Sequence, residues 1–472
     1  MLPRRSRTGG AAALLLSLSA LAPAQSLPCH DLQAIPPIAG ELLAAYPFTG
    51  SSNLRIDQGS QTVFSQAFGN FTLGTVVPIA SATKTLSAAV LMSLVDSGVL
   101  SLDDRVGQWL PEWNSSAMAP ITLRMCFSHT SGLPASHPAM LSDSITLRQA
   151  AALISTATLE YAPGTTFRYG DVGMHVAGAV CEVASGQSWV QLFQQRIAQP
   201  LQMVATDYLG PGTPANPRIG HGGRSNQRDY AEFFAMLRGG GLWHGVRVLS
   251  AASVAVMLTD HTSGLPIGHT PHPYQAPYGI GIWLDRKDSQ GRVVFASGVG
   301  ALGFAGWLDR DHDTSGAFVV QNQNPNSYPY LERMWQAAAD ALLPAGVTCF
   351  GSGSPPCADG TWVTGTSPAA AGNLDFAVRC AKAPANALGF VLLGPPLAAG
   401  QPFADLVGYV GPTIPVVAAV VSAVEGRATL AAPLPSGIGG AVLGLQSLWL
   451  SPASCTQLGL QASHALQLDV LP

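Results

Sequence analysis

The residues best suited to chemistry are Ser81 and Lys84, at the head of an apolar, helix-periodic run that extends to Gly98. Residues three apart lie on one helix face, with β-carbons about 5–6 Å apart, so a hydroxyl and an amine are predicted side by side. A serine becomes an effective nucleophile beside a base, and a buried lysine can supply or relay one. The helix N-terminus also favours developing negative charge. The spacing therefore predicts nucleophilic catalysis by Ser81.

The alternative for this pair is a solvated lysine at a helix start, because Ser-x-x-Lys recurs by chance. Lysine is rare in this chain, however, and the only others are Lys287 and Lys382. This rarity favours a functional role for the lysine on the first turn of this helix over that of an ordinary surface lysine.

The composition narrows the class of protein. The chain has 472 residues, of which 11% are charged, and its net charge is −4 with no basic run beyond the N-terminus. This length predicts two or three domains, and the charge predicts no nucleic-acid partner. No Cys/His spacing resembles a zinc site, so we expect no metal and no cofactor.

The N-terminus has the pattern of an export signal. A basic start, a short apolar run and a small-x-small pattern ending at Ala24 predict a signal peptide over residues 1–24. The alternative is an N-terminal membrane anchor. We expect a secreted protein, periplasmic or extracellular, with no membrane span in the mature chain. The apolar run from Ile414 to Val424 fits a buried strand.

Seven cysteines fit an exported chain, in which disulfides can form. Cys126 and Cys181 lie among apolar helical residues and are predicted to be buried thiols. The last four cysteines cluster in the C-terminal third, where one or two bridges are expected with the pairing left open. These four are Cys349, Cys357, Cys380 and Cys455.

The order of predicted elements indicates an α+β fold. Strands around residues 54–69 come first, helices follow, and short strands from 278 to 320 precede a helix over 331–343. This order predicts an antiparallel sheet flanked by helices, with an all-helical lobe inserted. We assign residues 25–344 to this domain and 345–365 to a Gly/Ser/Pro-rich linker. Period-two patterns then predict an all-β sandwich over 366–472, where no motif points to a ligand.

The chain up to about Leu343 resembles the serine β-lactamase-like superfamily, closest to class C β-lactamases, their DD-peptidase relatives and related esterases. Roughly 300 residues follow the family's order and spacing. The motifs that carry the resemblance are S-A-T-K at 81–84, S-L-D-D-R-V at 101–106, I-T-L-R…S-H-T-S-G-L-P at 121–134, P-G-T-T-F-R-Y-G-D at 163–171, Q-P-L-Q-M at 199–203 and G-A-L-G-F at 300–304.

This resemblance implies the roles of the catalytic residues. Ser81 corresponds to the nucleophile and Lys84 to its partner, while Tyr169 stands where the family's Tyr-x-Asn places a general base or relay. An unperturbed phenol titrates near pH 10, so this chemistry requires a neighbouring ammonium. The alternative for Tyr169 is a core aromatic. The oxyanion hole is expected from the backbone N–H groups of Ser81 and Ala301.

Two departures from the family pattern concern substrate binding. The family's Asn is Asp171 here; an amide can donate to a substrate carbonyl, whereas an ionised carboxylate cannot. The alternative role for Asp171 is a helix N-cap. The family's Lys-Thr-Gly or His-x-Gly triplet reads Gly298-Val299-Gly300 after Ser297, so a cation for a substrate carboxylate is missing at this position.

Ser297, Gly298 and Gly300, with Asp171, are nevertheless the expected substrate-binding positions. Arg168 or Arg224 could supply the missing cation from elsewhere. Three histidines are expected to have structural roles. We expect His129 to form hydrogen bonds in its turn, and His269 and His272 to lie in a loop flanked by prolines.

These observations favour a serine hydrolase that acts through an acyl-enzyme on a small ester or amide, or on a cell-wall-derived substrate. Loss of the family's cation favours the esterases of the superfamily. The alternatives are a DD-peptidase or β-lactamase and, from another class, a non-catalytic binding protein on the same fold.

Overall fold

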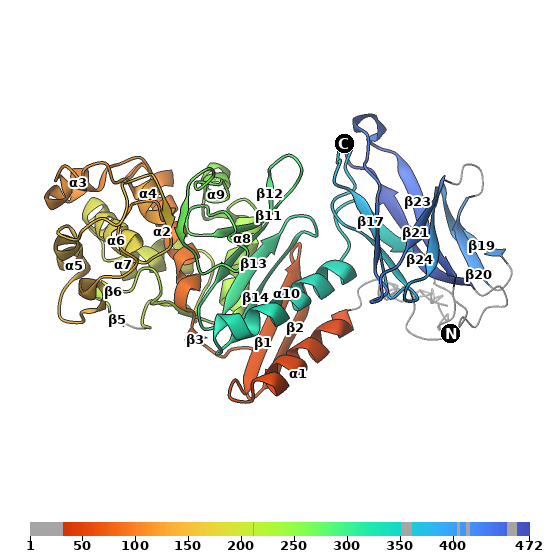
Figure 1. The fold of residues 1–472 in the computed structure, drawn as a ribbon, viewed down its shortest axis with the longest axis horizontal. Coiled ribbons are helices and arrows are strands. Elements are labelled where there is room, and N and C mark those ends of the chain that lie inside the picture. The colour runs from red at the N-terminus through yellow and green to blue at the C-terminus, as the bar shows by residue number, and fades with distance from the viewer. Residues whose placement is uncertain (1–31, 211, 351–360, 404–405, 412–415, 451–459) are drawn as a thin grey trace, which may run out of the picture.

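The computed structural model describes residues 32–210, 212–350, 361–403, 406–411, 416–450 and 460–472. Its centre is an antiparallel sheet of six strands in the order β11-β12-β13-β14-β1-β2 (Figure 1). The strands are β1 (Ser51–Gln58), β2 (Gln61–Gly69), β11 (Trp283–Lys287), β12 (Val293–Val299), β13 (Ala305–Asp309) and β14 (Thr314–Val320). Because β1 pairs with β14, the hairpin of β1 and β2 extends the sheet that β11 to β14 form.

Helices cover both faces of this sheet. On one face α1 (Ile35–Ala45) and α10 (Asn324–Ala341) pack on Phe318 and Val320 of β14. The alternate residues Ala317 and Val319 belong to the opposite core, which contains α2 (Thr83–Asp96) and α8 (Gln227–Arg238). Successive residues of a strand point to opposite faces of the sheet. Because helices cover both faces here, the residues of β14 are apolar without interruption from Ala317 to Val320.

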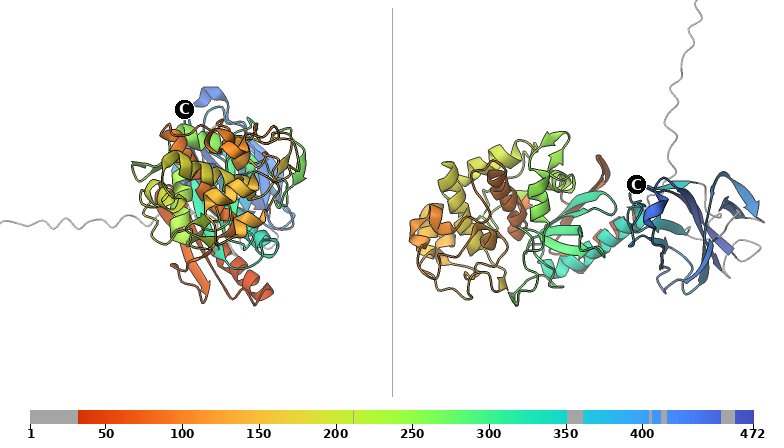
Figure 2. Two further views of the ribbon diagram at one scale, coloured as in Figure 1. Left: turned by 90° about the vertical axis from the view of Figure 1, so that its left-hand side faces the viewer. Right: turned by 90° about the horizontal axis from the view of Figure 1, so that it is seen from above.

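The helical lobe lies beyond α2, at one end of the molecule (Figure 2). It contains α3 (Val106–Trp109), α4 (Leu123–Phe127), α5 (Leu147–Ile154), α6 (Val172–Ser185) and α7 (Trp189–Phe193). Helix α2 runs between this lobe and the sheet, and every residue from Thr83 to Leu94 is buried. The fold class predicted from the sequence is therefore confirmed for this part of the chain. None of the described helices is long and apolar enough to cross a membrane.

The C-terminal region is built of strands. One sheet has the order β15-β24-β23-β18-β21 and another the order β16-β17-β22. Both sheets contribute to one core, in which Val378 packs with Trp449 and Leu466. The strands are β15 (Val347–Phe350), β16 (Trp362–Gly365), β17 (Ala377–Ala381), β18 (Leu388–Gly394), β21 (Val416–Val421), β22 (Ala428–Ala431), β23 (Val442–Leu450) and β24 (Leu460–Asp469), beside a hairpin of β19 (Pro396–Phe403) and β20 (Leu406–Val410).

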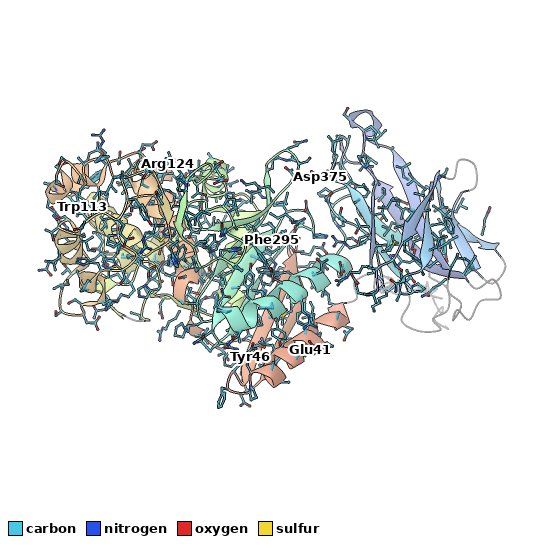
Figure 3. All side chains as sticks on the ribbon, viewed as in Figure 1. Glu41, Tyr46, Trp113, Arg124, Phe295 and Asp375 are labelled. Atoms are coloured by element: carbon cyan, nitrogen blue, oxygen red, sulfur yellow. The ribbon has the colours of Figure 1, made fainter. Side chains whose placement is uncertain are left out.

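Polar contacts join the two parts of the molecule, beside apolar packing of Leu343 on the C-terminal core. Asp375, labelled in Figure 3, accepts hydrogen bonds from the backbone N–H and the hydroxyl of Ser289, both at 2.9 Å. Asp340 at the end of α10 pairs with Arg379 at 3.0 Å and with Arg427 at 2.8 Å.

Several predicted elements differ in extent. Strands β15 and β16 lie within the predicted linker 345–365 and pair with β24 and β17, so these residues belong to the C-terminal sheets; residues 351–360 are outside the described residues. Helix α10 begins seven residues before the predicted start at Leu331, because prolines at 325 and 329 mask its apolar period. Within the motif at 121–134, α4 is followed by a loop.

Two further expectations concern burial and cysteines. The apolar strand predicted at 414–424 is β21, which lies at a sheet edge, and Val421 is 64% exposed there, so it is not the buried strand we expected. Cys126 and Cys181 are buried free thiols as predicted. Cys349 is disulfide-bonded, whereas Cys380 is a buried thiol.

Candidate active site

Ser81 lies in a 3₁₀ turn, η2 (Ala80–Ala82), directly before α2. Ala80 has φ 47°, a left-handed conformation that is uncommon for a residue with a β-carbon and is found where the surrounding structure imposes it. The turn is held from outside: the Ile79 N–H donates to the Gly223 carbonyl, and the Gly223 N–H donates to Thr83 Oγ1, both at 3.0 Å. The nucleophile predicted from the sequence is thus held on a rigid turn.

Lys84 is buried, and its Nζ has three acceptors. They are Ser81 Oγ at 3.1 Å, Asp171 Oδ1 at 2.5 Å and the Gly220 carbonyl at 3.0 Å. An ammonium has three donors and no acceptor, so this geometry uses all of them. Burial alone would lower the pKa of Lys84, but the charges of Asp171 and Tyr169 override burial and raise this pKa above its ordinary value. Lys84 is therefore a fixed cation beside Ser81 in this state, not a free amine.

Asp171 is the carboxylate that balances this cation. It occupies the N-cap position of α6, but its side chain does not cap the helix. Oδ1 accepts from Lys84 instead, and Oδ2 lies 3.0 Å from His221 Nδ1. Burial alone would raise the pKa of Asp171, yet Lys84 and then His221 hold this pKa well below its ordinary value. The Asp171 side chain is thus engaged in an ion pair rather than in the N-cap bond considered from the sequence.

Tyr169 follows β4 (Phe167–Arg168), which pairs with β10 (Ile267–His269), and its N–H donates to the His269 carbonyl at 3.1 Å. Its ring stacks on Trp283 with centroids 5.3 Å apart and planes at 16°. The ring of His129 lies 4.5 Å away, and Lys84 Nζ lies 4.7 Å from the Tyr169 ring centre. The structure therefore brings the phenol, the ammonium and the Ser81 hydroxyl together.

The backbone of Gly300 and Ala301 follows the end of β12 and passes close to Ser81. A β-carbon on Gly300 would lie 2.1 Å from the Ile79 carbonyl oxygen, so only glycine permits this approach of the strand to the nucleophile turn. Ser81, Gly300 and Ala301 all line one cavity. The two predicted oxyanion donors thus border the same space.

The other expected substrate-binding positions lie elsewhere. Ser297 is fully buried, and its hydroxyl has no hydrogen-bond partner among the described residues. A β-carbon on Gly298 would meet Thr85 Oγ1 at 2.6 Å, on the α2 side of the sheet. Arg168 pairs with Glu160 and Arg224 with Asp207. Neither arginine lines the cavity at Ser81, so neither replaces the cation that is missing from the triplet.

The cavity has a volume of about 290 Å³ and a mostly apolar, aromatic wall. None of its described lining residues is Asp, Glu, Lys or Arg. These residues are Ser81, Tyr169, Pro271, His272, Pro273, Trp283, Val299, Gly300, Ala301, Asn324, Pro325 and Tyr328.

His272 lies in the proline-flanked loop predicted from the sequence, whereas His269, assigned to the same loop, ends β10. That His272 lines the cavity was not predicted. It is buried, its ring packs on Trp283 at 4.8 Å, and Nε2 lies 3.0 Å from Asp285 Oδ1. Nδ1 accepts the Tyr274 N–H at 3.3 Å. The alternation Pro271-His272-Pro273 was the available signal, since prolines on both sides of a histidine fix the backbone around it.

The comparisons with known proteins agree with this geometry. The family model Beta-lactamase matches residues 53–341, more than half of the chain. The chain therefore belongs to the beta-lactamase family and is a serine hydrolase of that superfamily.

Particular relatives include both peptidases and esterases. The chain is 32% identical over 179 residues to D-alanyl-D-alanine-carboxypeptidase/endopeptidase AmpH of Escherichia coli K12, covering 34% of this chain and 45% of AmpH. It is 33% identical over 147 residues to Esterase EstB of Burkholderia gladioli, covering 27% of this chain and 37% of EstB. The chain thus matches less than half the length of either relative.

A solved structure of a candidate beta-lactamase from Bacteroides dorei superposes with a TM-score of 0.60 at 27% identity. The superposition covers 66% of this chain and 99% of that one. The catalytic part of the chain is therefore similar to a complete protein of this fold.

Proposed function

We propose that the protein hydrolyses small neutral carboxylic esters through an acyl-enzyme on Ser81. The observation that carries this proposal is the cavity at Ser81, whose described lining holds no Asp, Glu, Lys or Arg. An ionised group that enters such a space loses hydration worth several kcal/mol, and here it gains no counter-charge. An uncharged acyl group suits the aromatic and proline-rich wall.

The nearest cation does not change this conclusion. Lys84 is 1% exposed, and its three donors are used by Ser81, Asp171 and Gly220. A substrate carboxylate would have to displace one of these bonds. This disfavours β-lactams and acyl-D-Ala-D-Ala peptides, both of which carry a carboxylate.

The proposed reaction begins with attack of Ser81 Oγ on the ester carbonyl. Tyr169 enters this step as a phenolate beside the Lys84 ammonium, and its oxygen accepts the hydroxyl proton, because Lys84 is already protonated. The ammonium of Lys84 stabilises the negative charge that develops beside it, and the N–H groups of Ser81 and Ala301 bind the carbonyl oxygen as it becomes an oxyanion. Tyr169 then gives the proton to the departing alkoxide, which leaves the acyl group on Ser81.

Water completes the cycle. It attacks the acyl carbonyl, loses a proton to Tyr169 and forms the carboxylic acid, and the proton returns to Ser81 Oγ. Each step uses the same proton-transfer pair and the same oxyanion donors, as in other acyl-enzyme hydrolases.

The test is a substrate panel on the wild type and Ser81→Ala. We expect turnover of p-nitrophenyl acetate and butyrate, labelling by a fluorophosphonate, and loss of both in Ser81→Ala. A chromogenic cephalosporin and acyl-D-Ala-D-Ala should be turned over at least about 100-fold more slowly. Faster turnover of either would favour the β-lactamase or peptidase alternative. Folded wild-type protein that is not labelled would favour a binding protein.

We also propose export to the periplasm or medium, on the sequence pattern that ends at Ala24. Mass spectrometry of the mature protein should then give an N-terminus at Gln25, and retention of residues 1–24 would contradict this proposal.

A further inference from the structure

Two consecutive residues, Gly220 and His221, contact the two members of the ion pair between the buried Lys84 and the partly exposed Asp171. The Gly220 carbonyl accepts a hydrogen bond from Lys84 Nζ at 3.0 Å. His221 Nδ1 lies 3.0 Å from Asp171 Oδ2. Ser81, Lys84, Asp171 and His221 thus form a chain of hydroxyl, ammonium, carboxylate and imidazole.

The missing side chain of Gly220 leaves the space that the Asp171 carboxylate occupies. A β-carbon at Gly220 would lie 2.3 Å from Asp171 Oδ1 and 2.9 Å from its Cγ, so the carboxylate rests directly against the backbone. Any larger residue would push Asp171 away from Lys84. The segment and the carboxylate therefore fit each other.

His221 Nδ1 is buried, and no described residue makes a straight hydrogen bond to it. The Asp171 carboxylate is thus the acceptor that this nitrogen faces, across a bent contact. The other titratable groups that act in this region are the cations Arg218 and Lys84 and the buried His175, whose pKa burial lowers to about 3. None of these three is a carboxylate, so the acidic group that His221 faces here is Asp171.

We infer that His221 is a positioning residue, which acts on Lys84 through Asp171; this inference rests on the proposed function. Asp171 is a closer acceptor of the Lys84 ammonium than Ser81 Oγ, at 2.5 Å against 3.1 Å. Charge-assisted bonds are the stronger ones, so a carboxylate that rotates takes the ammonium with it. By holding Oδ2, His221 keeps Lys84 within reach of Ser81.

The comparison with an amide explains why this residue is needed. An Asn at position 171, as in the family pattern, would leave Lys84 without a strong competitor for Ser81. The carboxylate adds that competitor and a negative charge. The effect of His221 should therefore depend on the carboxylate and disappear when an amide replaces it.

The test is a double-mutant cycle of His221→Ala and Asp171→Asn. Loss of the 3.0 Å contact between His221 Nδ1 and the Asp171 carboxylate predicts that His221→Ala lowers kcat for p-nitrophenyl butyrate about 10- to 100-fold, with KM changed less than about threefold. In the Asp171→Asn background, His221→Ala should cost at most about twofold more. His221→Asn keeps an N–H near the Nδ1 position and should restore most of the rate. His244→Ala, at a histidine whose side chain is 53% exposed, is the matched control.

Equal losses from His221→Ala in both backgrounds would overturn the inference, as would full activity of the single variant. A structural readout separates this result from failure of the proposed function. In a crystal structure of His221→Ala, or of His221→Gln if that variant does not fold, Lys84 Nζ should lie beyond about 3.5 Å from Ser81 Oγ. Retention of the wild-type distance would contradict positioning by His221, whatever the substrate is.

Discussion

At the scale of single residues, the site combines buried charges with buried neutral histidines. Lys84 and Asp171 are charged because each compensates the other. His129, which packs on the Tyr169 ring, is different: burial first, and then the nearby Lys84 charge, lowers its pKa to about 3. Its Nε2 has no hydrogen-bond partner among the described residues, whereas its backbone carbonyl accepts the Arg168 N–H at 2.8 Å, so the hydrogen bond found at this turn residue is a backbone one. The neutral ring serves instead as a packing surface for Tyr169.

A pH dependence of stability follows from His129. Its pKa is lower in the folded than in the unfolded state, where it is about 6.5, so the unfolded state binds more protons between these values. The contribution to stability is complete above about pH 6.5 and is lost, by roughly 1.4 kcal/mol per pH unit, as the pH falls towards 3. In urea unfolding, the advantage of the wild type over His129→Asn should shrink between pH 7 and pH 5.

Asparagine suits this comparison because His129 has φ 59°, and Asn tolerates the left-handed region. His244→Asn is the control, since His244 also has a positive φ of 42° but is exposed. A difference between wild type and His129→Asn that stays constant with pH would show that the ring is not buried neutral.

At the scale of elements, the sequence predicted the parts of the site that local patterns determine. Ser81 and Lys84 are recognisable because their spacing and the apolar run of α2 lie within one segment. Residues that reach the site only through the folding of distant segments could not be predicted from local patterns. His221, for example, lies 50 residues after Asp171, in a segment with no periodic pattern. Likewise, the substrate role expected of Gly298 rested on a motif position, whereas the structure uses its missing side chain to admit Thr85.

The approach of β12 to the nucleophile turn gives a prediction at this scale. Gly300→Ala places a β-carbon against the Ile79 carbonyl, which cannot yield without moving η2 or Ala301. We expect kcat for p-nitrophenyl butyrate to fall about 10²- to 10³-fold, as when one oxyanion donor is lost.

Gly74→Ala is the matched substitution for comparison, because its β-carbon would meet nothing closer than Thr72 Oγ1 at 3.9 Å. Thermal unfolding of both variants separates loss of fold from loss of rate. Wild-type kcat in a folded Gly300→Ala protein would show that this approach does not position the oxyanion donors.

At the scale of the whole molecule, polar contacts of Asp375 and Asp340 join two folded parts. The period-two patterns that predicted an all-β C-terminal part are clearest in β24, where Leu466 and Leu468 are buried. The start of this part was placed too late, because the glycines and prolines of a linker-like composition also fill the turns between short strands. Composition alone does not separate these two cases.

Asp340 is the residue through which α10 holds the C-terminal sheets. Its side chain is 12% exposed and pairs with Arg379 and Arg427. Asp340→Asn should weaken both pairs, which costs about 1–2 kcal/mol. In calorimetry, the transition of the C-terminal part should move down by a few degrees, while ester kcat at 25 °C stays unchanged.

Glu41→Gln is the control, because the Glu41–Arg333 pair joins α1 to α10 on the surface with both side chains about half exposed. It should leave both transitions in place. An unchanged calorimetric profile for Asp340→Asn would mean that Asp340 does not couple the two parts.

The burial of α2 from Thr83 to Leu94 has a practical consequence for altering the enzyme. The helix that follows the proposed nucleophile has almost no free side on which to adapt, so a library of new selectivities gains nothing from randomising this stretch. The opposite rim of the cavity is formed by the loop at Pro271 and Pro273 and by the first turn of α10 at Pro325. Directed evolution toward bulkier acyl donors should therefore begin at those three prolines, where added room costs the scaffold least.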